Sequence, residues 1–200
     1  MQTEKTTPTI NDLPDGVYFL IDGTHESTGH RIYLPLDECK EAKPNAKYIG
    51  VKMGDRAIAV TLKDLPGDSD GELQLLPRNH RSPYTSEHYS WDTEKQVYRF
   101  NVYEDFDGKG NTERLKAAGC EIQLPDGEWI PSMGEIGLLM MNLSKVNKAL
   151  KLAGGKPLKR FSWSSTEGSQ VGAWHVGFSD GVTNLGNKSY SSAVRAVAAF

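Results

Sequence analysis

The fold class is decided by three runs near the C-terminus: Phe161-Ser-Trp-Ser-Ser-Thr-Glu167, Ala173-Trp-His-Val-Gly-Phe-Ser-Asp-Gly181 and Val194-Arg-Ala-Val-Ala-Ala-Phe200. Aromatic residues are interleaved there with small residues and almost no charge, which is typical of strands in a rigid β scaffold. Successive side chains of a strand point to opposite faces. We therefore expect Trp174, Val176 and Phe178 to be buried. The opposite face is predicted to be open: Ala173, His175, Gly177 and Ser179.

The composition fits one ordinary domain, or one domain with a small lobe. The 200 residues are 38% hydrophobic and include four Trp, which is enough for a core at this length. The net charge of −3 leaves no basic surface for nucleic acid or an anionic membrane, and the apolar runs are too short to cross a bilayer. The polar N-terminus shows no secretion signal. Cys39 and Cys120 form no zinc or redox motif, so we expect free, buried thiols.

The first half of the chain is predicted to be mainly β, after a disordered tail over residues 1–12. Apolar runs between turn residues indicate strands at 17–21, 31–34, 48–53, 56–62 and 96–103. Gly54-Asp55 separates the third run from the fourth and indicates a hairpin. Residues 65–95 are long for a connection, so they form either a functional loop or a flexible excursion. A short helix is expected at 111–118.

A second helix, over residues 133–152, has the clearest local signature. Ser132 and Glu135 have the spacing of a capping box, and Gly154-Gly155 marks the end. Apolar residues between these limits recur at the spacing of one helix face: Ile136, Leu139, Met140, Leu143, Val146 and Leu150. Two helices followed by a run of short strands predict an α+β fold.

Local motifs predict no catalytic residue, no metal site and no cofactor. Four loop histidines match no helix-borne metal motif: His25, His30, His80 and His88. The acidic loop 104–111 lacks the spacing of an EF-hand. The hydroxyls of residues 164–166 lie outside any nucleophile elbow, and His175 has no evident carboxylate to orient it.

The C-terminal half resembles the C-type-lectin-fold proteins of bacteria and their phages, and within them the variable proteins diversified by diversity-generating retroelements. The residues that carry the resemblance are Trp129-Ile-Pro-Ser132 with Glu135, Gly154-Gly155, Trp163-Ser-Ser-Thr-Glu167, Ala173-Trp-x-Val-x-Phe178 with Gly181, and Val194-Arg-Ala-Val197. The resemblance covers 125–200 and extends back to about residue 50. It implies a C-type-lectin-like domain over 51–200, preceded by an N-terminal β extension over 13–50.

The resemblance also implies a variable ligand-binding surface near the C-terminus. Mutagenesis of adenines in asparagine-type codons diversifies this family and cannot produce Trp, Lys or Gln, so Trp174 and Lys188 are expected to be framework and Gln170 lies outside the site. The implied ligand-binding residues are His175, Gly177, Val182, Asn184, Leu185, Gly186, Asn187, Ser189, Tyr190 and Ser192. The calcium and sugar motifs and the disulfides of animal lectins are missing, so calcium-dependent sugar binding is not implied.

The resulting expectation is a non-enzymatic, ligand-binding protein. The resemblance implies a receptor-binding protein of a phage or mobile element, located on a virion or a cell surface, whose partner is a protein or glycan on a bacterium. Oligomers are compatible with this function. Three alternatives stay open: a bacterial surface adhesin, an enzyme related to formylglycine-generating enzymes, and a structural part of a virion. A fold does not by itself carry a function.

Overall fold

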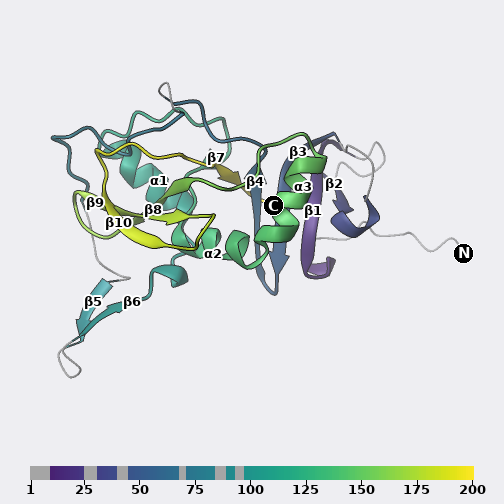
Figure 1. Cartoon of the computed structure of the whole chain (residues 1–200), viewed down its shortest axis with the longest axis horizontal. Helices are drawn as coiled ribbons and strands as arrows, with labels where there is room; N and C mark the ends of the chain where they lie inside the picture. The colour runs from purple at the N-terminus through teal and green to yellow at the C-terminus, as the bar shows by residue number, and fades with distance from the viewer. Residues whose placement is uncertain (1–9, 25–30, 40–44, 68–70, 84–88, 93–96) are drawn as a thin grey trace, which may run out of the picture.

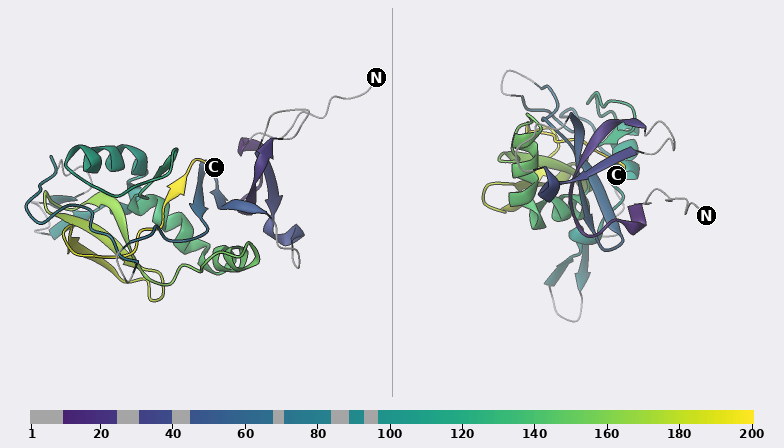
Figure 2. Two further views of the ribbon diagram at one scale, coloured as in Figure 1. Left: turned by 90° about the horizontal axis from the view of Figure 1, so that it is seen from above. Right: turned by 90° about the vertical axis from the view of Figure 1, so that its right-hand side faces the viewer.

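The chain has the α+β architecture that the sequence predicts (Figure 1). The computed structural model describes residues 10–24, 31–39, 45–67, 71–83, 89–92 and 97–200. Two main antiparallel sheets lie toward opposite ends of the long axis, and three α-helices pack against them within these residues (Figures 1 and 2). No helix among the described residues is long and apolar enough to cross a membrane.

The larger sheet has six strands in the order β2-β1-β3-β4-β11-β7. Their bounds are β1 Gly16–Thr24, β2 Arg31–Pro35, β3 Ala46–Met53, β4 Arg56–Thr61, β7 Glu128–Trp129 and β11 Val197–Ala198. The predicted hairpin at Gly54-Asp55 is confirmed, because β3 and β4 pair from Tyr48↔Thr61 to Met53↔Arg56. β3 also pairs with β1, so the sheet runs without a break across residue 50, where the N-terminal extension was expected to end.

Both faces of the six-stranded sheet are apolar, because alternate residues of each central strand point to opposite sides. One face forms the main core with the helices α2 (Met133–Met141) and α3 (Leu143–Leu152), through Val17, Phe19, Ile49, Val51, Ile58 and Val60. The other face carries Tyr18, Leu20, Tyr48, Ala59 and Ala198. The ring of Phe200 covers part of this second face and stacks on Tyr33, with 5.4 Å between ring centroids.

The smaller sheet has three strands in the order β10-β9-β8, which places β10 at its edge. The bounds are β8 Phe161–Glu167, β9 Gly172–Gly177 and β10 Thr183–Asn187. A second apolar core lies under this sheet and receives Leu115 from helix α1 (Gly108–Ala117), together with Leu75, Leu76, Trp163 and Ala173. Two further strands, β5 (Tyr89–Asp92) and β6 (Val97–Phe100), pair with each other.

The predicted helix over 133–152 is two helices, so the described residues contain three α-helices where the sequence predicted two. The expected capping box is confirmed at the start of α2: Ser132 N–H donates to Glu135 Oε2 at 2.7 Å, and Glu135 N–H donates to Ser132 Oγ at 3.4 Å. The break falls at Asn142, whose backbone leaves the helical region (φ −113°, ψ 14°). Its side-chain amide donates to the Leu138 carbonyl at 3.1 Å, which competes with the continuing helix.

Part of the long connection over 65–95 is packed against the rest of the protein. Leu75 and Leu76 are 0% and 1% exposed, so this part of the connection is packed on the second core, whereas Arg78 and Arg81 are exposed. The predicted strand 96–103 is shorter, because 102–104 form a 3-10 turn after β6. Of the predicted tail, residues 10–12 form a 3-10 turn, and residues 1–9 lie outside the described part, as do His25, His30 and His88.

Candidate functional site

The β9–β10 hairpin and the turn after it hold the predicted binding residues. β9 and β10 pair in the register Asn184↔His175, Leu185↔Trp174 and Gly186↔Ala173. Three large apolar side chains of this region are exposed, by 44% at Val182, 47% at Leu185 and 66% at Tyr190. Single apolar side chains are common on protein surfaces, whereas a group of them close together can mark an interaction site. We call Val182, Leu185 and Tyr190 the apolar surface of the hairpin.

Trp163 supports this hairpin from below. Its side chain is 1% exposed, and its indole Nε1 donates to the Leu73 carbonyl at 3.0 Å. The backbone of β10 lies close against the ring, since a Cβ atom added at Gly186 would come within 2.8 Å of a Trp163 ring carbon. Trp163 is therefore part of the rigid framework under the hairpin.

The prediction that one face of β9 is open is wrong. Val176 and Phe178 are buried as expected, at 1% and 4% exposure, whereas Trp174, which was expected to be buried with them, is only half-buried. Ala173 on the opposite face is also buried. Leu75 and Leu76 pack in the same apolar core as Ala173. The two-residue period of the strand could not predict this contact, because it comes from a distant part of the chain. β9 is therefore a central strand with both faces packed.

His175 is half-buried between two aromatic rings. Its imidazole stacks on Trp163 with 5.0 Å between centroids and lies 5.4 Å from the ring of Phe161. Its Nδ1 atom has no hydrogen-bond partner among the described residues. Burial lowers the pKa of His175 below its usual range, so the ring is neutral at neutral pH. The structure therefore gives His175 a packing role under the hairpin and little exposed surface.

Two other predicted binding residues lie inside the fold. Ser192 is 5% exposed, and its hydroxyl donates to the Phe161 carbonyl at 3.0 Å. Gly177 is buried at a turn, where an added Cβ would lie 2.3 Å from Asp180 Oδ1 and 3.0 Å from the Phe161 ring. The predicted residues that reach the surface are Val182, Asn184, Leu185, Asn187 and Tyr190, with Gly186 and Ser189 partly exposed.

Lys188 joins the segments that surround the end of the hairpin. Its side chain is 1% exposed and forms an ion pair with Glu167, whose side chain is 10% exposed. The ammonium also donates to Ser82 Oγ at 2.7 Å and to the Ser169 carbonyl at 3.0 Å. Burial lowers the pKa of Lys188, and the hydrogen bond and charge of Glu167 oppose that shift. Lys188 thus has the framework position that was expected of it, in a segment whose neighbours are exposed.

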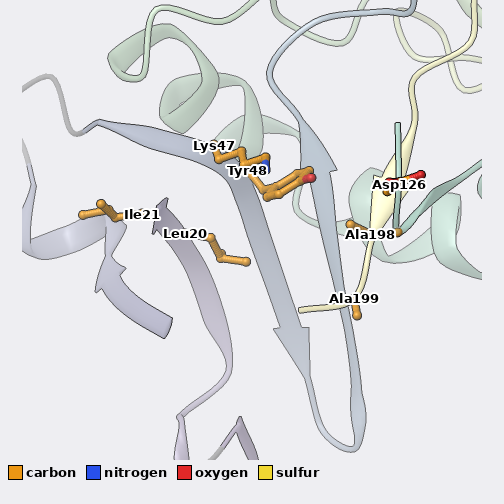
Figure 3. Close-up of a pocket in the computed structure, with 8 residues that line it drawn as sticks. Leu20, Ile21, Lys47, Tyr48, Asp126, Ala198 and Ala199 are labelled. Atoms are coloured by element: carbon orange, nitrogen blue, oxygen red, sulfur yellow. The ribbon is translucent and has the colours of Figure 1, made fainter. Parts of the chain in front are cut away.

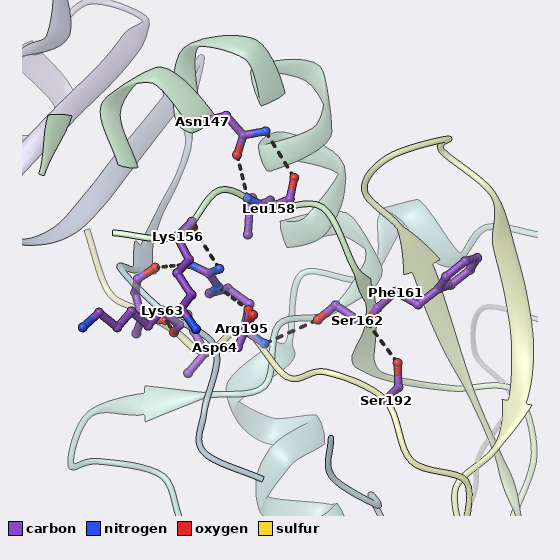
Figure 4. Close-up of polar contacts among 11 residues, drawn as sticks. Lys63, Asp64, Asn147, Lys156, Leu158, Phe161, Ser162, Ser192 and Arg195 are labelled. Carbon is purple, nitrogen blue, oxygen red and sulfur yellow. Dashed lines mark hydrogen bonds and ion pairs between the residues drawn. The ribbon is translucent and has the colours of Figure 1, made fainter. Parts of the chain in front are cut away.

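A second buried charge fixes the C-terminal run to the rest of the fold (Figure 4). Arg195 is 1% exposed, and its Nε donates to Asp64 Oδ1 at 2.6 Å. Its two terminal nitrogens donate to the carbonyls of Thr61 and Lys156, each at 3.0 Å. All three groups of the guanidinium are therefore used within the protein, and the network is structural.

A cavity of about 240 Å³ lies on the far face of the larger sheet, beside β1, β3 and β11 (Figure 3). Leu20, Tyr48, Asp126 and Ala198 line it. The Tyr48 hydroxyl donates to Glu128 Oε1 at 2.9 Å, and the Lys47 ammonium lies 5.6 Å from the Tyr48 ring. These side chains are engaged within the protein, so this cavity offers less for recognition than the hairpin.

The acidic loop before α1 stabilises the start of that helix. The Asp107 side chain caps the helix by accepting from Gly110 N–H at 3.0 Å. Asp105 accepts from the Asn111 amide at 2.7 Å and from the Thr166 hydroxyl at 2.6 Å. Across the described residues, no group of three or more His, Cys, Asp or Glu could hold a metal ion. Cys39 and Cys120 form no disulfide; Cys39 is buried as expected, whereas Cys120 is only partly buried.

Sequence reasoning missed the contribution of the segment 71–83. Gln74, Arg78 and Arg81 line a groove together with Asn187 and Tyr190, although more than a hundred residues separate the two segments in the sequence. The amino-acid composition of the two segments does not predict that they meet, because the contact depends on long-range backbone pairing between Leu73 and Ser192.

Comparison with known proteins shows one distant likeness. No protein-family model matches the chain, and no curated protein matches it. The structure is similar to the crystal structure of a fimbrial protein from Bacteroides ovatus, with a TM-score of 0.51 and 18% sequence identity. The match covers 94% of this chain and 49% of that protein, so this chain spans about half its length. At this identity the likeness shows a shared fold.

Proposed function

We propose that this chain is a bacterial surface protein of the adhesion type, which binds its ligand on β10 and the following turn. The observation that carries the proposal is the apolar surface of Val182, Leu185 and Tyr190, which stands exposed on a rigid support. The support consists of the buried Trp163 and the buried Lys188–Glu167 pair. The likeness to a fimbrial protein over 94% of the chain supports a role at a cell surface.

The chemistry of this surface favours binding over catalysis. Tyr190 offers a large contact area and a hydroxyl at low cost in rotamer entropy, as tyrosines do in antibody binding sites. Asn184 and Asn187 are exposed beside it and can donate or accept hydrogen bonds. His175, the one histidine among the expected binding residues, is held between aromatic rings. The partner of this proposal is a protein or glycan of a cell surface.

A second candidate is a receptor-binding protein of a phage or mobile element with a diversified surface. The alternation of buried Lys188 with exposed or half-exposed Asn187, Ser189 and Tyr190 favours it, because mutagenesis of asparagine-type codons cannot produce Lys. The neighbouring DNA tests this candidate. A near-copy of the coding region for 168–195 beside a reverse transcriptase gene supports diversification, and the lack of one leaves the adhesin.

The adhesion proposal is tested with the triple variant Val182→Ser, Leu185→Ser, Tyr190→Ser in the full chain. We expect it to lose binding to intact cells and surface extracts from a panel of bacteria, while its melting temperature changes little because the side chains are exposed. The matched control is Met141→Ser, which removes a 66% exposed apolar side chain from α2. Full binding by the triple variant would place the site elsewhere.

A further inference from the structure

The turn after β10 forms one wall of an open groove of about 700 Å³. Residues 71–83 form the other wall, with Gln74, Arg78 and Arg81. Asn187, Ser189 and Tyr190 face them, and Val171 completes the lining. Part of the proposed binding surface is therefore shared with a segment that lies far away in the sequence.

The lining of this groove is cationic, although the chain as a whole has a net charge of −3. Arg78 and Arg81 are exposed, and no carboxylate lines the groove with them. Two other arginines have acidic partners by contrast: Arg160 pairs with Glu72 at 2.7 Å, and Arg195 pairs with Asp64. Within the described residues neither Arg78 nor Arg81 has such a partner. Two guanidinium groups therefore remain available to a ligand.

The backbone under the groove is held in place before any ligand arrives. Leu76 N–H donates to the Lys188 carbonyl at 3.1 Å, and Ser82 N–H donates to the Gln170 carbonyl at 3.1 Å. Lys188 itself is neutralised by Glu167 beneath the groove, so it adds no net charge to the lining. A fixed backbone lowers the entropy that binding must overcome. The two walls thus present their side chains at a defined separation.

We propose that this groove binds an acidic glycan, and the proposal rests on the adhesion function above. Guanidinium groups bind carboxylate and sulfate groups through paired, charge-assisted hydrogen bonds. Tyr190, which is 66% exposed, provides an aromatic face on which the apolar side of a sugar ring can lie. The amides of Gln74 and Asn187 can serve the sugar hydroxyls. A polyacidic peptide would meet the same two guanidinium groups, but it would have no ring to place on the exposed aromatic face of Tyr190.

The test uses the full chain and four defined probes in calorimetric titrations at low salt. The probes are trigalacturonate, its fully methyl-esterified neutral form, a sulfated trisaccharide and hexaglutamate. We expect one or both acidic saccharides to bind, the neutral ester to bind at least tenfold more weakly, and binding to weaken as salt is added. The carboxylate and sulfate probes identify which acidic group the groove prefers. Stronger binding of hexaglutamate than of both saccharides, or no binding of either saccharide, overturns the proposal.

Substitutions then locate the bound glycan. Arg78→Gln and Arg81→Gln should each weaken binding about tenfold, as expected for loss of a charged hydrogen bond, and Tyr190→Ala should weaken it similarly. Lys148→Gln, an exposed position on α3, removes the same charge and should leave binding unchanged. Equal binding by wild type and both arginine variants overturns the assignment. If the arginine double variant still adheres to cells like wild type, the groove inference fails while the adhesion proposal stands.

Discussion

Replacing Lys188 by Met tests the rigid support on which both proposals depend. The change keeps a long side chain but removes an ammonium that is 1% exposed and that satisfies Glu167, Ser82 and the Ser169 carbonyl. Breaking a buried ion pair from one side leaves the other charge without compensation, which costs about 3–5 kcal/mol. For a chain of this size that loss corresponds to a fall in melting temperature of about 10 °C.

The measurement is urea denaturation followed by tryptophan fluorescence, with wild type and Lys188→Met compared at neutral pH. The matched control is the double variant Lys188→Met, Glu167→Gln, which removes both charges and should recover most of the lost stability. A loss below about 1 kcal/mol for the single variant is the size found for exposed pairs. Such a small loss would refute the reasoning, because it would mean that water reaches the Lys188–Glu167 pair.

Three further predictions concern pH, the core and metals. Burial raises the pKa of Glu135 from its ordinary 4.5 to about 7. Between pH 4.5 and 7 the folded protein therefore keeps a proton on Glu135 that the unfolded chain has released. The resulting stabilisation is complete below pH 4.5 and disappears as pH rises through 7, a difference of about 3 kcal/mol; Glu135→Gln should abolish this pH dependence in denaturant titrations, and an unchanged slope would contradict it. Trp163→Ala should cost about 3–5 kcal/mol, whereas Leu185→Ala should cost within roughly 0.5 kcal/mol, and equal losses in the same assay would contradict the division into support and surface. Adding a chelator should leave the melting temperature unchanged, and a fall that calcium reverses would show that the acidic loop holds a cation.

Local signals predicted the local structure well. The Gly54-Asp55 turn gave the β3–β4 hairpin, and the Ser132/Glu135 spacing gave the start of α2. Both depend on residues within a few positions of each other, where turn and capping chemistry act. The break at Asn142 was missed because the apolar spacing continues through it, while the side-chain bond to the Leu138 carbonyl does not show in a periodic pattern.

The candidate site could be predicted only in part. Exposure of Val182, Leu185 and Tyr190 agrees with the predicted surface, because the hairpin is short and its turn residues are polar. Leu73 pairs with the backbone of Ser192 and accepts a hydrogen bond from Trp163, the ring on which His175 stacks. Such long-range placement follows from the arrangement of the whole chain, and no local period encodes it. The arginines of the groove were overlooked for the same reason.

The segment around Lys188 has a fixed backbone but carries side chains that can be substituted. The backbone at this point is fixed by main-chain bonds, from Leu76 N–H to the Lys188 carbonyl and from Lys188 N–H to the Val171 carbonyl at 2.9 Å. Main-chain bonds do not depend on the side chains of neighbouring residues, so Tyr190 can be replaced without moving the backbone. Asn187 is different, because its Oδ1 accepts from both the backbone N–H and the hydroxyl of Ser189, each at 3.0 Å. Under the proposed function, Tyr190 can therefore be exchanged to suit a ligand, whereas Asn187 must also hold the turn that presents Tyr190.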